Sequence, residues 1–302
     1  MTTVFPDASI YRISGATRQK SNASLVHRFD DINAATGIVE RVPDVYNFLG
    51  GKQTDLGVGV PGSFGVWELD MRSGDTVVRQ LVGIPDGGLL AGILPWPGHT
   101  CIVLVSDATL GKIYRVDICV RSYEVVLEHE SMYPPKWAPL AFGVGGLHLR
   151  RGYLYYANSF NAKIYRVRVD GEGYPAERAT VEMVNDLDAL YLDNFAIGPK
   201  SSGVIWACTN ADNRVVAIER GGETRVVAGA ADELTVAGAV SASFGRLPGD
   251  QDTLYVVTSG AMLFPINGSI SEGGKVVALD TGAFVAGEGE GKDEFRSELR
   301  RI

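Results

Sequence analysis

Nearly the same short sequence motif, in which aliphatic and polar residues alternate, occurs five times in this sequence. The five copies are Val66-Trp67-Glu68-Leu69-Asp70, Ile113-Tyr114-Arg115-Val116-Asp117, Ile164-Tyr165-Arg166-Val167, Val215-Val216-Ala217-Ile218 and Val276-Val277-Ala278-Leu279-Asp280. A fainter copy, Ile10-Tyr11-Arg12-Ile13, opens the chain. The copies lie roughly 45 to 60 residues apart, a period that is typical of repeat architectures such as propellers. The repeat therefore constrains the fold more than any other feature.

Each repeat predicts four short strands separated by turn residues, which is the unit of a β-propeller blade. The clearest copy places strands at 145–149, 153–157, 163–167 and 179–184, and the other repeats place inner strands near 37–41, 91–96, 195–198 and 240–244. No segment has a long helical stripe of apolar residues. We therefore predict an all-β fold, a six-bladed β-propeller of four-stranded blades. The first, ring-closing blade is expected to be incomplete or irregular, with its strands divided between the two ends of the chain.

The predicted propeller occupies residues 1–282 as a single domain, and residues 283–302 form a polar C-terminal tail. The 302 residues carry a formal net charge of −8 and no basic patch, which argues against nucleic acid as a partner. The apolar runs are too short and interrupted to span a bilayer, so no membrane partner is expected. The first residues do not resemble a signal peptide, and we therefore expect a soluble protein and favour the cytoplasm.

The sequence has three cysteines, Cys101, Cys119 and Cys208, and they form no C-x-x-C pair. The odd number and the spacing argue against a disulfide framework, and each cysteine is expected to be a small buried strand residue. Two triplets, Asn22-Ala23-Ser24 and Asn267-Gly268-Ser269, fit the N-glycosylation motif. That motif matters only in a secreted protein.

Several segments also match a known family. They are Ala23-Ser24-Leu25-Val26-His27-Arg28-Phe29, Ile102-Val103-Leu104-Val105 through Asp107-Ala108-Thr109-Leu110-Gly111, Gly152-Tyr153-Leu154-Tyr155-Tyr156-Ala157-Asn158-Ser159-Phe160, Asp193-Asn194-Phe195-Ala196, and Asn267-Gly268-Ser269 followed by Glu272-Gly273-Gly274-Lys275-Val276-Val277-Ala278. Through these residues the chain resembles fungal members of the SMP-30/gluconolactonase-like six-bladed propellers, from Ala23 to Gly282.

The resemblance implies a metal site in those members that hydrolyse lactones, where a Glu and Asn or Asp residues at the starts of inner strands hold a divalent cation. In this sequence Ala91 and Gly145 match the two Asn positions, the Glu position would fall before Met1, and only Asp193 remains. A hard cation needs several converging oxygen ligands. We therefore expect no metal and no other cofactor.

Similar propellers in fungal natural-product pathways act as cyclases, which include hetero-Diels-Alderases. The resemblance thus implies a metal-independent cyclase that performs a hetero-Diels-Alder or related pericyclic cycloaddition on a small polyketide or terpenoid substrate. Such a reaction is accelerated by a pocket that positions both reactants, excludes water and places a hydrogen-bond donor on a carbonyl oxygen. We expect that pocket on the face bearing Ala91, Gly145, Phe160 and Asp193.

Three residues are candidates for a catalytic role. Asp193 stands where the family keeps its carboxylate, and the alternative is that it caps its own turn. Tyr191 is a candidate phenolic donor, and Asn158 offers an amide in the loop between second and third strands. Asp107 and Asn210 lie in equivalent loops, where fixing the loop is the simpler explanation.

A second set of residues is expected to contact substrate: Ala91, Trp137, Gly145, Ser159, Phe160, Asn194 and Met262. The small Ala91 and Gly145 would enlarge the pocket where the family keeps ligands. Trp137 follows Pro134 and Pro135 and could stack on a flat substrate, or pack on a neighbouring loop.

Two other functions stay open. The first is a lactonase or esterase-like hydrolase that binds a metal through different residues, and the second is a non-catalytic propeller that binds a ligand or a partner. Chelation separates the first from a cyclase, and substitution of Asp193 and Tyr191 separates the second.

Overall fold

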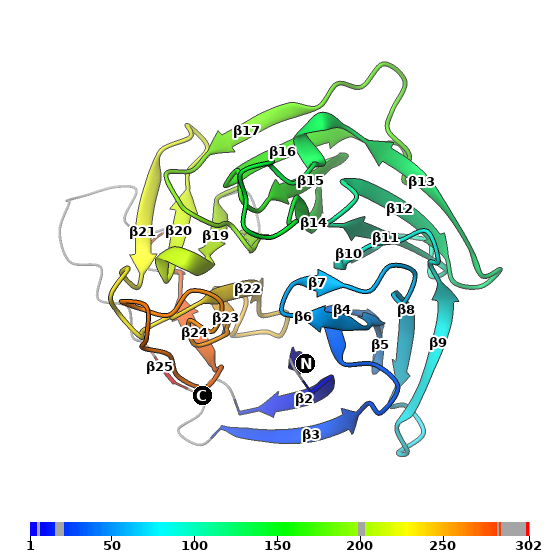
Figure 1. Ribbon diagram of the computed structural model, residues 1–302, viewed down its shortest axis with the longest axis horizontal. Coiled ribbons are helices and arrows are strands. Elements are labelled where there is room, and N and C mark those ends of the chain that lie inside the picture. The colour runs from blue at the N-terminus through cyan, green and yellow to red at the C-terminus, as the bar shows by residue number, and fades with distance from the viewer. Residues whose placement is uncertain (5–6, 16–20, 199–202, 283, 285–299, 302) are drawn as a thin grey trace. The chain divides into compact units, whose positions relative to one another are not determined.

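The computed structural model describes residues 1–4, 7–15, 21–198, 203–282, 284 and 300–301. These residues form an all-β structure that contains four-stranded antiparallel sheets of the kind found in propeller blades (Figure 1). The chain divides into two compact units. The first comprises Met1–Ile13 and Ala23–Val184, and the second comprises Ser14–Asn22 and Asn185–Ile302.

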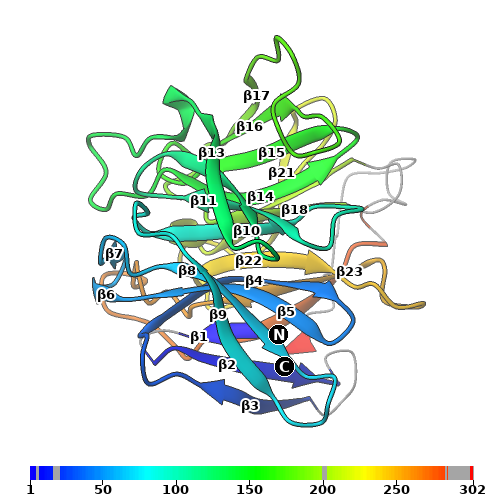
Figure 2. The ribbon, with the colours of Figure 1, turned by 90° about the vertical axis from the view of Figure 1, so that its right-hand side faces the viewer.

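The first unit contains the opening three-stranded sheet and a four-stranded sheet that carries an additional hairpin. The opening sheet is formed by β1 (Thr2–Val4), β2 (Ser9–Ser14) and β3 (Asn22–Arg28). The next sheet has the order β4 (Ala34–Val42), β5 (Val45–Gly51), β8 (Gly65–Asp70) and β9 (Val77–Gly83), and the hairpin consists of β6 (Gln53–Asp55) and β7 (Val58–Gly59). In Figure 2 the hairpin extends beyond the end of its parent sheet.

Two further four-stranded sheets follow in chain order. One contains β10 (Leu90–Pro95), β11 (Ile102–Asp107), β12 (Lys112–Asp117) and β13 (Ser122–Glu128), and the other contains β14 (Val144–Arg150), β15 (Tyr153–Asn158), β16 (Lys163–Arg168) and β17 (Glu182–Asp186). A short 3-10 helix, η1 (Glu130–Met132), lies between β13 and β14.

The second unit contains two four-stranded sheets. The first has β18 (Asn194–Ile197), β19 (Ile205–Thr209), β20 (Arg214–Ile218) and β21 (Thr224–Ala228), with the 3-10 helix η2 (Asn210–Asp212) between β19 and β20. The second has β22 (Ala239–Phe244), β23 (Thr253–Thr258), β24 (Val276–Asp280) and β25 (Arg300–Arg301).

The repeated motif lies in the third strand of each four-stranded sheet, in β8, β12, β16, β20 and β24. This confirms the strand assignment of the repeat, and the predicted inner strands coincide with β4, β10, β14, β18 and β22. The prediction of six four-stranded blades is wrong in number, since the described residues form five four-stranded sheets and one three-stranded sheet. The opening sheet is incomplete, as expected, but its strands all come from the N-terminal part, and the C-terminal β25 pairs with β24 instead.

The core consists of apolar layers between neighbouring sheets. One layer, with Val66, Leu90 and Val105 among its members, fills the space between the second and third sheets of the first unit. In the second unit a layer containing Trp206, Val215 and Leu254 joins the two sheets. Middle strands such as β11 are buried along their whole length because they have an apolar layer on each face.

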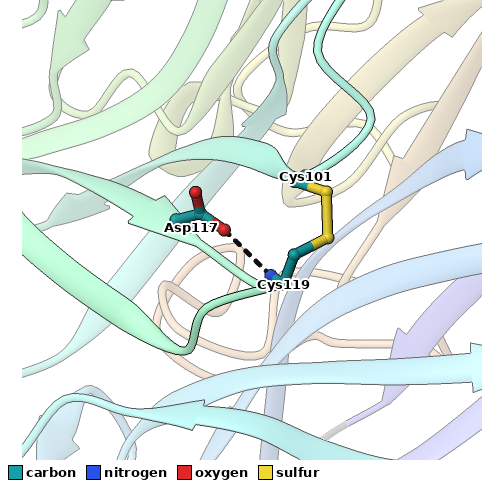
Figure 3. Close-up of side chains that lie close together, drawn as sticks. All are labelled: Cys101, Asp117 and Cys119. Carbon is teal, nitrogen blue, oxygen red and sulfur yellow. Dashed lines mark hydrogen bonds between the residues drawn. A yellow bond between two sulfur atoms is a disulfide. The ribbon is translucent and has the colours of Figure 1, made fainter.

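One sequence expectation is overturned, because Cys101 and Cys119 form a disulfide (Figure 3). Cys101 directly precedes β11 and Cys119 follows the end of β12, and Ile102 pairs with Asp117 across these antiparallel strands. The two Cα atoms are therefore only 5.4 Å apart. The spacing of 18 residues comes from strand pairing, which a search for C-x-x-C pairs does not detect. Cys208 is free and buried, as expected.

No helix among the described residues is long and apolar enough to cross a membrane. The single-domain assignment over 1–282 and the tail assignment over 283–302 remain predictions, although Arg300–Arg301 adds a strand within the expected tail.

Candidate functional site

A half-buried carboxyl group, Asp193, lies directly before the inner strand β18. Its backbone N–H donates a hydrogen bond to the carbonyl oxygen of Cys208 at 3.0 Å, which aligns it with the end of β19. The side-chain amide of Asn210, the first residue of η2, donates to Asp193 Oδ2 at 2.9 Å. The strand pairing and η2 thus bring these two polar side chains together.

Burial raises the pKa of Asp193 from 3.8 to about 7, while the hydrogen bond from Asn210 acts in the opposite direction. The carboxyl group therefore exists in both protonation states near neutral pH. Protonated, it can donate a hydrogen bond, and ionised, it can accept one. Titration in this range is typical of residues that act in acid–base or hydrogen-bond catalysis.

Two neighbours of Asp193 were not among the site residues predicted from the sequence. Asn210 is 3% exposed, and its Oδ1 has no hydrogen-bond partner within the described part of the chain. Burial and the charge of Asp193 raise the pKa of the Cys208 thiol. The thiol therefore stays protonated and does not serve as a thiolate nucleophile. The register of β18 on β19 is the signal that could have placed both residues beside Asp193.

Tyr191 reaches the same region of the second unit and is 4% exposed. Its ring packs on Phe264 with the ring centroids 6.0 Å apart. The carboxylate of Asp212 accepts a hydrogen bond from the backbone N–H of Leu190 at 2.8 Å and another from that of Tyr191. The helix η2 therefore fixes both the Asp193 side chain, through Asn210, and the segment that carries Tyr191.

The long connection between β23 and β24 carries Met262 and Phe264. Lys275 holds the base of this connection. Its ammonium group forms a hydrogen-bonded ion pair with Glu272 and donates to the carbonyl oxygen of Leu234 at 2.5 Å. Met262 is 42% exposed and so is available for contact. The other predicted contact residue of this unit, Asn194, donates to Ser241 Oγ at 3.2 Å and thereby joins β18 to β22.

In the first unit the amide of Asn158 holds its own loop and the connection before β14. Its Nδ2 donates to the carbonyl oxygens of Ser131 at 2.8 Å and Tyr133 at 2.9 Å, and its Oδ1 accepts from the N–H of Asn161 at 3.2 Å. Asn158 is fully buried and Ser159 is 3% exposed. These contacts give Asn158 a structural role, and its predicted catalytic role remains a prediction.

The aromatic residues predicted to contact substrate in the first unit do lie together. Trp137 meets Phe160 edge to face with the centroids 6.0 Å apart, and Phe142 stacks on the same ring at 6.3 Å. Phe160 is buried, whereas Trp137 is 66% exposed. The three residues form an aromatic cluster whose outermost member is open to solvent, an arrangement suited to a flat apolar ligand.

Ala91 and Gly145 lie in bulges of the inner strands β10 and β14. Ser106 Oγ accepts a hydrogen bond from the N–H of Gly92 at 2.8 Å and donates to the carbonyl oxygen of Gly145 at 2.6 Å. The two inner strands thus approach each other closely, and a Cβ atom added at Gly92 would lie 2.5 Å from the carbonyl oxygen of Gly145. Whether Ala91 and Gly145 also touch substrate remains a prediction.

The described residues contain one cluster of His, Cys, Asp or Glu side chains that could share a metal ion, and it does not include Asp193. Within the described ranges, the one group of three His, Cys, Asp or Glu ligand atoms close enough to share an ion consists of Cys101, Asp117 and Cys119. Its two sulfur atoms are bonded to each other, as Figure 3 shows, so they offer no thiolate. Asp193 belongs to no such group.

The comparisons with known proteins agree with the propeller-like fold and suggest a chemistry. No family model matches the chain. It is 28% identical over 282 residues to a protein from a Phoma species named "Putative hetero-Diels-Alderase", covering 85% of this chain and 78% of that one. It is 27% identical over 310 residues to "Putative hetero-Diels-Alderase asR5" of Sarocladium schorii, covering 92% and 77%.

Two solved structures are similar in fold. A chain of the nidogen–laminin complex matches with a TM-score of 0.62 at 12% identity, over 92% of this chain and 87% of its own. Regucalcin from Agrobacterium tumefaciens, a calcium-binding protein, matches with a TM-score of 0.55 at 12% identity, over 82% and 74%. At this level of identity the likeness concerns the fold alone.

Proposed function

We propose that this chain is a cyclase of specialised metabolism that joins a conjugated heterodiene to an alkene in a hetero-Diels-Alder or related pericyclic cycloaddition. The observation that carries the proposal is the similarity, over most of the chain, to two proteins that bear the name of this activity. The proposed substrates are small polyketide or terpenoid molecules.

The chemistry places few demands on the protein. In a concerted cycloaddition two σ bonds form as π electrons redistribute, and no nucleophile, metal or net proton transfer is required. The protein accelerates the reaction by holding the reactants in a near-attack arrangement and by stabilising the charge that grows on a carbonyl oxygen of the heterodiene. A single hydrogen-bond donor at that oxygen is therefore the most valuable polar group.

We assign that donor to Asp193. Because Asn210 donates to Oδ2, the proton of the neutral carboxyl group belongs on Oδ1, which is then free to donate to the substrate oxygen. The pKa of about 7 provides a substantial neutral fraction at physiological pH. An aspartic acid kept neutral by burial so that it can donate is an established device for stabilising an oxyanion.

The remaining candidates supply shape in this proposal. In the second unit, which carries Asp193, Tyr191 packs on Phe264, and Tyr191, Asn194 and Met262 stay the candidates for substrate contact. In the first unit, Trp137 and Phe160 meet edge to face and stay candidates for contact with an apolar ligand. Metal independence is part of the proposal, and it is supported by the position of Asp193 outside any group of three His, Cys, Asp or Glu ligand atoms in the described residues.

The test is a cycloaddition assay with the purified protein. A precursor that releases an ortho-quinone methide is mixed with a terpene alkene, with and without EDTA, and the cycloadduct is measured by chiral chromatography and mass spectrometry. We expect faster formation and one enriched stereoisomer, both unaffected by EDTA. Hydrolysis of a lactone panel that EDTA abolishes would instead identify a metal hydrolase, and binding without product formation would identify a ligand-binding module.

A further inference from the structure

The triplet Asn267-Gly268-Ser269 forms the tip of a tight hairpin within the connection between β23 and β24. Ile266 and Ile270 pair across the turn, and the N–H groups of Gly268 and Ser269 donate to the carbonyl oxygens of Pro265 at 2.9 Å and Ile266 at 3.1 Å. Asn267 and Gly268 have φ values of 51° and 77°, as Asn-Gly turns with a left-handed backbone require. The turn is therefore specified by the same residues that make up the glycosylation motif.

The tip projects into solvent while its base is anchored. Asn267, Gly268 and Ser269 are all exposed, whereas Ile266 is 4% exposed and packs with Ala237 and Ala261. Among the described residues the Asn267 side chain has no hydrogen-bond partner to give up. A bulky saccharide on its amide nitrogen would therefore displace no contact.

The second triplet of this type, Asn22-Ala23-Ser24, differs in its setting. It lies in strand β3, where Ser24 Oγ donates to the carbonyl oxygen of Arg12 at 3.4 Å. The carbonyl oxygen of Asn22 accepts from Ser14 Oγ at 3.4 Å. The Ser24 hydroxyl and the Asn22 backbone are thus hydrogen-bonded within a sheet. The triplet Asn22-Ala23-Ser24 therefore serves as a control for the exposed turn at Asn267.

The disulfide points independently to the compartment in which glycosylation occurs. Asp117 Oδ1 accepts from the N–H groups of Cys119 at 2.9 Å and Val120 at 3.0 Å, which fixes the turn that carries Cys119 beside Cys101 (Figure 3). Disulfides form and persist in oxidising compartments such as the lumen of the endoplasmic reticulum, and they are rare in the cytosol. This observation argues against the cytoplasmic location favoured from the sequence.

We propose that Asn267 is an N-glycosylation site and that the chain matures in the secretory pathway with the Cys101–Cys119 disulfide closed. In the transfer, the amide nitrogen of Asn267 forms a C–N bond to the anomeric carbon of an oligosaccharide carried on a polyprenyl diphosphate. The bond between that carbon and the diphosphate breaks, and the proton lost by the amide leaves with the polyprenyl diphosphate. In the oxidation, the two thiols lose two protons and two electrons to a disulfide of an oxidoreductase, which becomes a dithiol.

The test maps the modification on protein produced from the complete gene in a filamentous fungal host. Digestion with a peptide-N-glycosidase in heavy-oxygen water converts a glycosylated Asn to labelled Asp, which mass spectrometry locates. We expect the label at Asn267 and not at Asn22. Asn267→Gln and Ser269→Ala should abolish it, Ser269→Thr should retain it, and Asn22→Gln should leave it unchanged. Ser269→Ala keeps the native residue in the left-handed turn, so its loss of label does not depend on altered folding.

The same preparation tests the disulfide. Free thiols are alkylated before digestion without reductant, and we expect a linked Cys101–Cys119 peptide pair with Cys208 alkylated only after unfolding. An unlabelled Asn267, or alkylated Cys101 and Cys119 in the native protein, would overturn the proposal. Neither measurement uses the cycloaddition, so failure here is distinct from failure of the proposed function.

Discussion

The connections between second and third strands are built alike in the two units but use their polar side chains differently. In β11–β12, β15–β16 and β19–β20 the connection has the same length, because Asp107 pairs with Lys112, Asn158 with Lys163 and Thr209 with Arg214. In each, the last residue of the connection, Gly111, Ala162 or Asn213, has a positive φ.

In the first unit the residue that ends the second strand holds its own loop. Asp107 accepts hydrogen bonds from the N–H groups of Gly88, Thr109 and Leu110, and Asn158 is similarly occupied. In the second unit Asn213 takes over this task, since it donates to the carbonyl oxygen of Ala231 and accepts from the N–H of Gly238. Asn210, the residue after the end of β19, donates instead to Asp193. The comparison teaches that the Asp107 and Asn158 side chains of the first unit bind backbone groups, whereas Asn210 of the second unit donates to a carboxyl group.

The largest effect is expected from Asp193→Ala. Loss of the donating carboxyl group should lower kcat by about 10²–10³-fold, the usual consequence of removing one donor from an oxyanion site. The cycloaddition rate measured at saturating substrate checks this. Asp188→Ala, the same change at an exposed carboxyl group in the connection before β18, serves as control and should leave the rate unchanged.

The pH dependence follows from the same group. Because the protonated form donates, the wild-type rate should be highest below the Asp193 pKa of about 7 and should fall as pH rises above it. The folded state also binds the proton more tightly than the unfolded chain, so the free energy of unfolding should decrease as pH rises from about 4 to about 7. Both dependences should be weaker in Asp193→Ala, and a wild-type rate that rises above pH 7 would contradict the assignment.

The next largest effect concerns stability in the first unit. Asn158→Ala removes three hydrogen bonds of a fully buried side chain, which should reduce the free energy of unfolding by about 2–4 kcal/mol. Denaturant titration measures the loss. The control Asn161→Ala keeps the backbone N–H that contacts Asn158 and should cost far less. A stable Asn158→Ala protein with a reduced cycloaddition rate would break the comparison in favour of a catalytic role.

A smaller effect is expected from Asn210→Ala, because Asn210 is a positioning residue. Its hydrogen bond favours the ionised form of Asp193, so its removal should raise the pKa of that carboxyl group. The pH at which the rate falls should therefore move upward, and kcat should drop by about tenfold through loss of orientation. A merely structural role would leave the pH profile unmoved, and Asn161→Ala again provides the control.

The smallest effect is expected from Trp137→Ala. Since Trp137 is 66% exposed, the free energy of unfolding should change by no more than about 0.5 kcal/mol. Loss of one aromatic contact worth about 1 kcal/mol should raise KM about fivefold while kcat stays constant. Val120→Ala, which truncates another exposed side chain of the first unit, should change neither constant.

The sequence predicted the parts of the fold that repeat. A strand can be recognised from the sequence when the same alternation of apolar and polar residues recurs in several repeats. For this reason β8, β12, β16, β20 and β24 were located correctly. The disulfide was missed because it depends on which turns become neighbours when β11 pairs with β12.

The candidate site was less predictable for a related reason. The partners of Asn158 are carbonyl groups of Ser131 and Tyr133, which belong to the connection before β14 and are 27 and 25 residues earlier in the chain. Sequence alone aligned Asn210 with Asn158, whereas the strand register aligns Thr209 with it. A shift of one residue decides whether an amide supports its loop or reaches a carboxyl group.

The close approach of inner strands in the first unit limits how this protein can evolve. A methyl group added at Gly37 would lie 2.6 Å from the carbonyl oxygen of Ala91, and one added at Gly92 would lie 2.5 Å from that of Gly145. Larger residues are therefore forbidden at these two positions whatever the substrate. Sequence change is less restricted in the loops, where the exposed Trp137 and Met262 can be exchanged without disturbing the scaffold.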